Sequence, residues 1–195
     1  SGTVGKAAEG SAEQPAPTVA FKRLGTLEFD QVATAMAVSA EGSGSLAVAL
    51  EKGGLRRYAP PWSNTPVAEV KLGDAAHVGR AIWVHNELWG LDVGQSVLIR
   101  WRPGQEPVAV SLDAAPRDLW FDAARNRVWL LHHHGLEVYD PTLVPRLPAV
   151  ARLPIEGTPV GLFAAPAGDQ LVVPLYRERV ALRFVTDPPS AGAAK

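Results

Sequence analysis

The 195-residue chain has 19 basic and 20 acidic residues and a formal net charge of −1, so it offers no excess of positive charge to nucleic acid or to an anionic membrane. Cysteine is absent, which excludes disulfides, thiolate metal sites and thiol catalysis. The length suits one domain with a real core, and no apolar run approaches the ~20 residues of a membrane-spanning helix. We therefore expect a single globular domain that neither binds nucleic acid nor inserts into a membrane.

The two ends of the chain are predicted to lie outside the folded domain. Residues 1–20 consist mainly of Gly, Ala, Ser, Glu and Pro, and such a segment has too little apolar surface to offset the entropy lost on ordering. Residues 187–195 have a similar composition. We expect a flexible leader, which could also tether the domain to an anchor or a neighbouring domain, a folded domain over 21–186, and a flexible tail.

Between these ends a hairpin pattern occurs four times. Each copy has four mostly apolar residues, a short turn and a second strand that ends in an aromatic residue. The leucines that close the first strands, at positions 50, 91, 131 and 175, are separated by 41, 40 and 44 residues. A period of about 40 residues is typical of a repeat fold. The hairpins cover residues 47–58, 88–101, 128–139 and 172–184.

Further short apolar runs flank the hairpins and complete four-stranded units. Since one such sheet leaves both of its faces half-covered, the sheets must stack, and radial stacking predicts an all-β fold, a β-propeller of four four-stranded blades. The repeats span about 30–72, 74–112, 113–155 and 156–186. One run precedes each hairpin, at 35–38, 81–84, 118–121 and 160–164, and another follows the first three, at 67–72, 108–112 and 149–155.

The fourth unit has no outer strand of its own, because the chain enters a Pro-rich segment soon after Phe184. Residues 24–29 precede the first unit as residues 67–72 precede the second, so an N-terminal strand, about 21–29, is predicted to complete the last blade and close the ring. The alternative is a half-ring, in which two chains form an eight-bladed propeller. Pro174 interrupts a central strand, which predicts a bulge or an irregular last blade.

Two of the repeats, residues 39–58 and 121–140, resemble bacterial propeller repeats of the YVTN, NHL and quinoprotein type. In those repeats a turn with Gly, Asn or Asp leads into a strand, a tight turn and a second strand. The resemblance covers roughly residues 21–185, although the YVTN tetrapeptide and the Gly-His and Trp-Asp pairs of WD repeats are absent. It implies a fold more than a function.

The resemblance to propellers implies that the hairpin turns and the loops between blades emerge on the same face, which often binds partners. This places a mixed set of charged and aromatic side chains on one candidate binding face. Trp62 lies in a Pro-rich loop and is expected as an exposed contact residue on the opposite face, whereas the tryptophans within strands are expected in the core. The candidates from the turns are Asp92, His132, His133, His134, Tyr176, Arg177 and Arg179.

Two sets of residues are candidate metal ligands. One acidic residue follows each outer strand, and a ring of four carboxylates could hold Ca²⁺, although Asp is also a common turn residue. The run of three histidines could bind Zn²⁺, although a solvated turn is the favoured explanation. The acidic candidates are Asp30, Asp74, Asp113 and Glu156.

No catalytic motif is visible: the chain lacks a nucleophile elbow, a phosphate-binding loop and a dinucleotide fingerprint. The sequence therefore favours a non-enzymatic binding or scaffold module that offers a rigid face to a protein partner. No cofactor is expected apart from the candidate Ca²⁺ or Zn²⁺. A metal-dependent propeller hydrolase or lactonase is the enzymatic alternative, and a homodimer corresponds to the half-ring. Composition suggests a bacterial source, with the periplasm or the extracellular space favoured over the cytoplasm.

Overall fold

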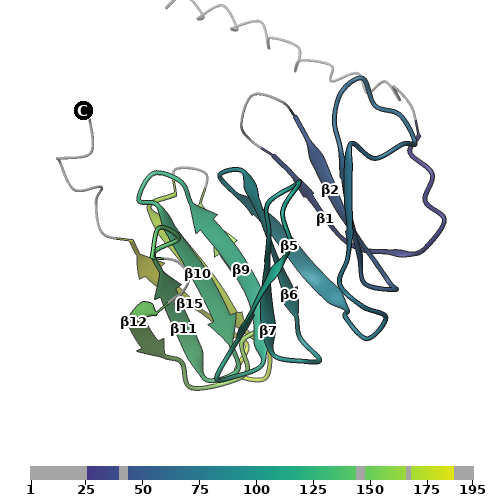
Figure 1. The fold of residues 1–195 in the computed structure, drawn as a ribbon. Coiled ribbons are helices and arrows are strands. Elements are labelled where there is room, and N and C mark those ends of the chain that lie inside the picture. The colour runs from purple at the N-terminus through teal and green to yellow at the C-terminus, as the bar shows by residue number, and fades with distance from the viewer. Residues whose placement is uncertain (1–25, 40–43, 144–147, 166–167, 187–195) are drawn as a thin grey trace, which may run out of the picture.

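A computed structural model describes residues 26–39, 44–143, 148–165 and 168–186. Within these ranges the chain forms strands and no helix, and the strands make four antiparallel sheets that lie side by side in an arc (Figure 1). No helix of the described residues is long and apolar enough to cross a membrane. The all-β prediction is confirmed.

Each sheet, called a blade below, follows chain order from an inner to an outer strand. The four predicted hairpins are present, as are their predicted flanking strands, except that the strand expected at 160–164 covers only Phe163–Ala164. Blade 1 contains β1 (Ala33–Val38), β2 (Leu46–Leu50), β3 (Gly54–Tyr58) and β4 (Ala68–Lys71), and blade 2 contains β5 (Val78–Val84), β6 (Glu87–Asp92), β7 (Val97–Trp101) and β8 (Val108–Ser111). Blade 3 contains β9 (Pro116–Asp122), β10 (Arg127–His132), β11 (Gly135–Tyr139) and β12 (Ala149–Pro154), and the described part of blade 4 contains β13 (Phe163–Ala164), β14 (Gln170–Leu175) and β15 (Val180–Val185).

Alternation along the second strand of each blade sends side chains to two faces. In β2, Ala47 and Ala49 face blade 2, whereas Val48 and Leu50 lie on the opposite side. We call the side toward the next blade along the chain the forward face, and the other side the backward face. Small or apolar residues at both sets of positions allow a blade to pack against another blade on either side.

Three buried clusters join consecutive blades, and in each the forward face of one blade meets the backward face of the next. Full burial of one large apolar side chain is worth about 1.5–3 kcal/mol, so these clusters hold the arc together. The expectation that the strand tryptophans are core residues is confirmed. Trp89 is completely buried, and Trp83, Trp120 and Trp129 pack at the edges of the clusters.

Polar contacts between neighbouring blades add to this packing. The Thr34 hydroxyl donates to the carbonyl oxygen of Val78 at 2.7 Å, linking blades 1 and 2. In blade 3, the Asp118 carboxylate pairs with Arg80 of blade 2 at 2.7 Å and accepts a hydrogen bond from the amide of Leu162, just before β13, at 2.8 Å. These contacts bring the inner strands together along the arc.

The predicted closure of the ring by an N-terminal strand is not observed. Residues 26–29 form no strand, and Leu27 and Phe29 instead pack on the backward face of blade 1, where Phe29 lies 5.7 Å from the Tyr58 ring. The apolar side chains of this segment are thus satisfied by blade 1. Among the described residues, β15 pairs only with β14 and no buried cluster joins blade 4 to blade 1. Residues 21–25, the rest of the expected strand, lie outside the described residues.

The irregular last blade predicted from Pro174 is confirmed. Pro174 lies within β14 and pairs with Ala181 of β15 in a continuous register, so the strand has no bulge on that side. On its other side, the inner strand β13 is only two residues long and pairs with Leu171 and Val172. Because proline has no N–H to donate, it cannot supply the ladder bond that a longer inner strand would need.

Candidate functional site

The hairpin turns and the loops between blades lie together at one edge of the arc. Backbone hydrogen bonds join each outer strand's end to the neighbouring turn of the same blade. The amide of Leu112 donates to Ser96 at 2.9 Å, and the amide of Ile155 donates to His134 at 3.1 Å. The loops that start at these residues are thereby fixed beside the turns. We call this edge the turn face.

An open groove with a volume of about 640 Å³ crosses the turn face between blades 2, 3 and 4. Val93 and Val160 supply exposed apolar surface to it. Arg117, His133 and His134 supply polar groups, and Arg117 Nη2 lies 3.4 Å from His133 Nδ1. The groove therefore combines apolar walls with groups that bind carboxylates or carbonyls. It is lined by Val93, Asp113, Ala114, Ala115, Pro116, Arg117, His133, His134 and Val160.

The structure separates the three histidines of the candidate face. The rings of His133 and His134 are exposed and lie 4.7 Å apart. His132 is partly buried instead: its Nδ1 accepts a hydrogen bond from the His134 amide at 3.3 Å, and its Nε2 lies 4.0 Å from Glu137 Oε1. Burial lowers the pKa of His132, and the nearby Glu137 carboxylate opposes this shift. His132 thus supports the turn, and the other two line the groove.

The lowered pKa of His132 makes a pH dependence testable. Between its folded-state pKa and the ordinary value of about 6.5, the unfolded chain binds more protons than the folded chain. The contribution of His132 to the free energy of unfolding is therefore fully present above about pH 6.5. It is lost as the pH falls through the folded-state pKa. We expect the drop in Tm between pH 7.5 and pH 5 to be smaller in His132→Asn than in the wild type. His133→Asn is the exposed control and should show the wild-type drop; equal drops in all three proteins would contradict this.

The other turn candidates divide between buried and exposed positions. Asp92 lies at the turn face but is 2% exposed, because its carboxylate accepts hydrogen bonds from the amides of His77 and Gln95 at 2.9 and 3.0 Å. It therefore ties the β6–β7 turn to the preceding loop and is not presented to a partner. The turn of blade 4 is exposed, and Tyr176 is 76% exposed beside Arg177 and Arg179.

Trp62 is half-exposed and lies away from the turn face. It borders a groove on the backward side of blade 1, together with Phe29, Met36, Val38 and Leu46. The groove has a volume of about 790 Å³ and its lining is almost wholly apolar. Trp62 therefore offers part of an exposed apolar surface at the end of the arc.

Three of the four acidic candidates form ion pairs at the surface. Asp30 pairs with Arg56, Asp74 lies 2.8 Å from Lys71, and Asp113 lies 3.4 Å from Arg152. The hydrogen bonds from Arg56 and Lys71 lower the pKa of Asp30 and of Asp74. Across the described ranges, no group of three or more His, Cys, Asp or Glu residues is arranged to hold a metal ion. The Ca²⁺ or Zn²⁺ site, and the metal-dependent hydrolase built on it, remain predictions that no described contact supports.

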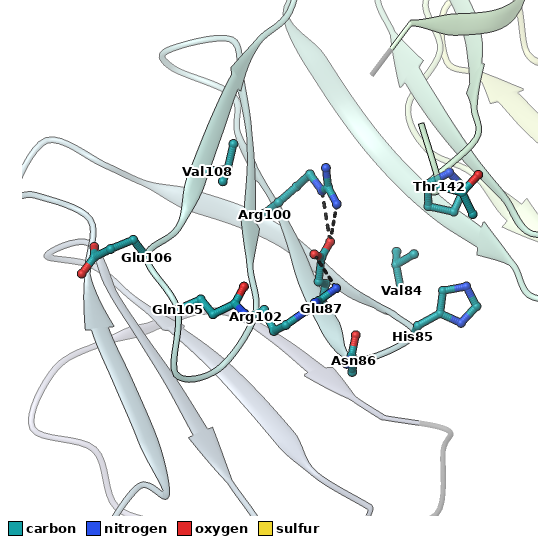
Figure 2. A pocket seen from close by; sticks show the side chains of 11 residues that line it. Val84, His85, Asn86, Glu87, Arg100, Arg102, Gln105, Glu106, Val108 and Thr142 are labelled. Atoms are coloured by element: carbon teal, nitrogen blue, oxygen red, sulfur yellow. Dashed lines mark hydrogen bonds and ion pairs between the residues drawn. The ribbon is translucent and has the colours of Figure 1, made fainter. Parts of the chain in front are cut away.

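A further pocket lies at the opposite edge of blade 2, around the β5–β6 turn (Figure 2). Here Glu87 accepts hydrogen bonds from Arg100 at 2.6 and 3.1 Å and from Arg102 at 3.2 Å. The Arg100 guanidinium also lies 4.9 Å from the Trp89 ring centre. Because Glu87 is fully engaged in these contacts, it is poorly suited to act as a general base, and the cluster is better explained as a structural ion pair.

Sequence reasoning missed Val93, Arg117 and Val160 of the turn-face groove. Each lies within or next to a turn or inter-blade loop that the repeats did predict, so the position of the loop was the available signal. It was not sufficient, since the sequence does not tell which loop residues point toward a neighbouring blade. Asp113 was predicted as a metal ligand, and the structure places it at the rim of the groove.

No known protein family and no curated protein matches the sequence. Among solved structures, the chain is similar to the β-propeller domain of Cps50 (Swd1) from Myceliophteria thermophila, with 15% identity over 84% of this chain and 55% of that one and a TM-score of 0.66. It is similar to the computationally designed Ika4 protein, with 16% identity over 85% of this chain and 99% of that one and a TM-score of 0.62. It is also similar to a candidate 6-phosphogluconolactonase from Bacteroides uniformis, with 11% identity over 80% and 50% and a TM-score of 0.63.

These likenesses show the fold alone: the chain is an all-β domain of propeller blades. They do not single out the YVTN, NHL or quinoprotein type of repeat. The chain spans about half the length of the Cps50 and lactonase propellers and nearly all of the designed protein. Function must therefore be argued from the surface of this chain.

Proposed function

We propose that this chain is a non-enzymatic interaction module whose protein partner docks in the turn-face groove. The carrying observation is that exposed apolar and polar side chains from blades 2, 3 and 4 meet in one open groove. Val93 and Val160 offer apolar contact, and Arg117, His133 and His134 offer donors for a carboxylate or a carbonyl. Apolar surface that includes Arg and lacks Lys is typical of protein interfaces.

The groove is held by backbone structure, which favours binding without large rearrangement. Its histidines sit in the two-residue turn between β10 and β11, where His132 pairs with Gly135. Its loop at 113–117 is anchored by the Leu112–Ser96 hydrogen bond and leads directly into β9. Groups held in place in this way lose little conformational entropy when they bind. A peptide segment with one acidic and one apolar side chain matches the chemistry of the groove.

A displayed library of random peptides tests this proposal, because the groove itself then selects the sequences that bind it. Peptides selected on the wild-type protein should bind an Arg117→Ala/His134→Ala variant at least about tenfold more weakly, a loss of about 1.4 kcal/mol. Glu106→Ala changes an exposed residue of the pocket in Figure 2 and should leave binding unchanged. Selected peptides that bind all three proteins equally, or a failure to select any, would overturn the assignment of the groove.

A further inference from the structure

The segment 26–29 lies where the outer strand of a preceding blade would lie. In blade 1, Val70 and Leu72 of the outer strand region pack into the cluster between blades 1 and 2. In blade 2, Val110 and Leu112 pack in the same way between blades 2 and 3. Leu27 and Phe29, with the same spacing, pack on the backward face of blade 1. Blade 1 is therefore prepared for a preceding blade that the described residues do not supply.

Blade 4 lacks what the segment 26–29 could provide. In the described part of the chain, β15 is a six-residue edge strand paired on one side only. Natural proteins cover or charge such edges, because an open edge is a template for pairing with another strand. The equivalent strands β3, β7 and β11 each pair with an outer strand. Over the described ranges, the edge of β15 thus lacks an outer strand, and the segment 26–29 has the spacing and the packing of one.

Within the described residues, no blade covers the forward face of blade 4, whose side chains are mostly apolar. Val172 and Pro174 on this face correspond to Trp89 and Leu91 in blade 2, which are buried against blade 3. Phe163 pairs with Val172 and is 60% exposed. On the backward side of blade 1, the apolar groove beside Trp62 is open as well. Each end of the arc thus carries the half-interface that the other end lacks.

We propose that a second copy of this chain closes the arc into an eight-bladed ring by reciprocal strand completion. Residues 26–29 of one copy pair with β15 of the other, and the forward face of blade 4 packs on the backward face of blade 1. The same contact occurs twice around a two-fold axis. Two copies therefore cover the open edge of β15 and the exposed faces of blades 1 and 4 in both chains. The occupant is a second copy because three interfaces within this chain already join these two kinds of face. This inference does not depend on the turn-face groove.

The repeats also fix the register of the new pair. In blade 1, Gly54 of β3 pairs with Lys71 of β4. Val180 occupies the place of Gly54 in its own hairpin, where it pairs with Leu175. Glu28 occupies the place of Lys71, because Glu28 directly precedes the packed Phe29 as Lys71 directly precedes the packed Leu72. We therefore expect Val180 of one copy to lie directly opposite Glu28 of the other, within disulfide distance in an antiparallel pair.

A cysteine pair tests the proposal directly, because the chain has no cysteine of its own. The full-length Glu28→Cys/Val180→Cys protein is oxidised and separated on a non-reducing gel. A disulfide-linked dimer is expected. A disulfide within one chain, with monomer mobility, would overturn the proposal in favour of a four-bladed ring. Free thiols in both positions, or a ladder of larger species, would overturn it too.

Mass measurement of the unmodified chain supplies an independent readout. Native mass spectrometry should give twice the chain mass of 20.7 kDa. Phe163→Lys places a charge on the forward face of blade 4 and should weaken the dimer at least about tenfold. Val150→Lys is the matched control, since Val150 is an exposed strand valine on the outer strand of blade 3. A monomeric wild type, or equal dimer strength in both variants, would contradict the proposal.

Discussion

A Glu87→Ala variant should unfold with a free energy about 3 kcal/mol lower than that of the wild-type protein. Arg100 is 5% exposed, and its guanidinium is neutralised by Glu87 (Figure 2). Removing the carboxylate would leave a buried positive charge, and the Trp89 ring nitrogen would lose its acceptor at 3.1 Å. The expected loss lies at the lower end of the usual 3–5 kcal/mol for a broken buried pair, because the Glu87 side chain keeps 17% exposure.

Urea unfolding followed by tryptophan fluorescence measures this loss, and two further variants show its cause. A Glu87→Leu/Arg100→Met protein removes both charges and should be much closer to the wild type than Glu87→Ala, since neither charge remains unpaired. Asp74→Ala breaks the exposed pair with Lys71 and should leave the unfolding midpoint unchanged. If Glu87→Ala unfolds like Asp74→Ala, the pair contributes nothing beyond a surface contact.

The repeat could be predicted from the sequence because a strand, a short turn and a second strand recur four times at nearly constant spacing. The leucines at 50, 91, 131 and 175 recur with nearly constant spacing, and each lies at the end of the second strand of its blade, except that Leu91 and Leu131 are followed by one more strand residue. Pro174 could also be predicted to disturb its blade, since the missing N–H is a property of the residue itself. Local chemistry was sufficient for these features.

Ring closure could not be predicted, because it depends on which blade lies beside the segment 26–29. The spacing of Leu27 and Phe29 fits the outer strand of a blade that precedes blade 1, and only the three-dimensional arrangement of the arc decides whether that blade is blade 4 of the same chain. The candidate site shows the same limit. The residues at 132, 133 and 134 are all histidines, yet only His132 turns inward, toward Glu137 on the adjacent strand.

A Gly53→Ala substitution should lower the free energy of unfolding by roughly 2–4 kcal/mol. Gly53 lies in the β2–β3 turn with a φ of +72°, which disfavours any residue with a side chain. A Cβ at this position would lie 2.0 Å from the carbonyl oxygen of Gly73, so the backbone on one side must move. The amide of Leu72 donates to the Gly53 carbonyl oxygen at 2.7 Å, and this movement would strain the bond that anchors the outer strand of blade 1.

Gly168→Ala separates the steric clash from the unfavourable backbone angle. Gly168 has a similar φ of +68°, but a Cβ there would meet nothing within 4 Å. This control should therefore lose only about 1 kcal/mol, the cost of the backbone conformation. Equal losses in the two variants would mean that the turn of blade 1 moves freely away from Gly73. The β2–β3 turn is part of the turn face. A larger loss in the free energy of unfolding for Gly53→Ala than for Gly168→Ala would therefore show that close backbone contact between this turn and the outer strand holds the turn face rigid.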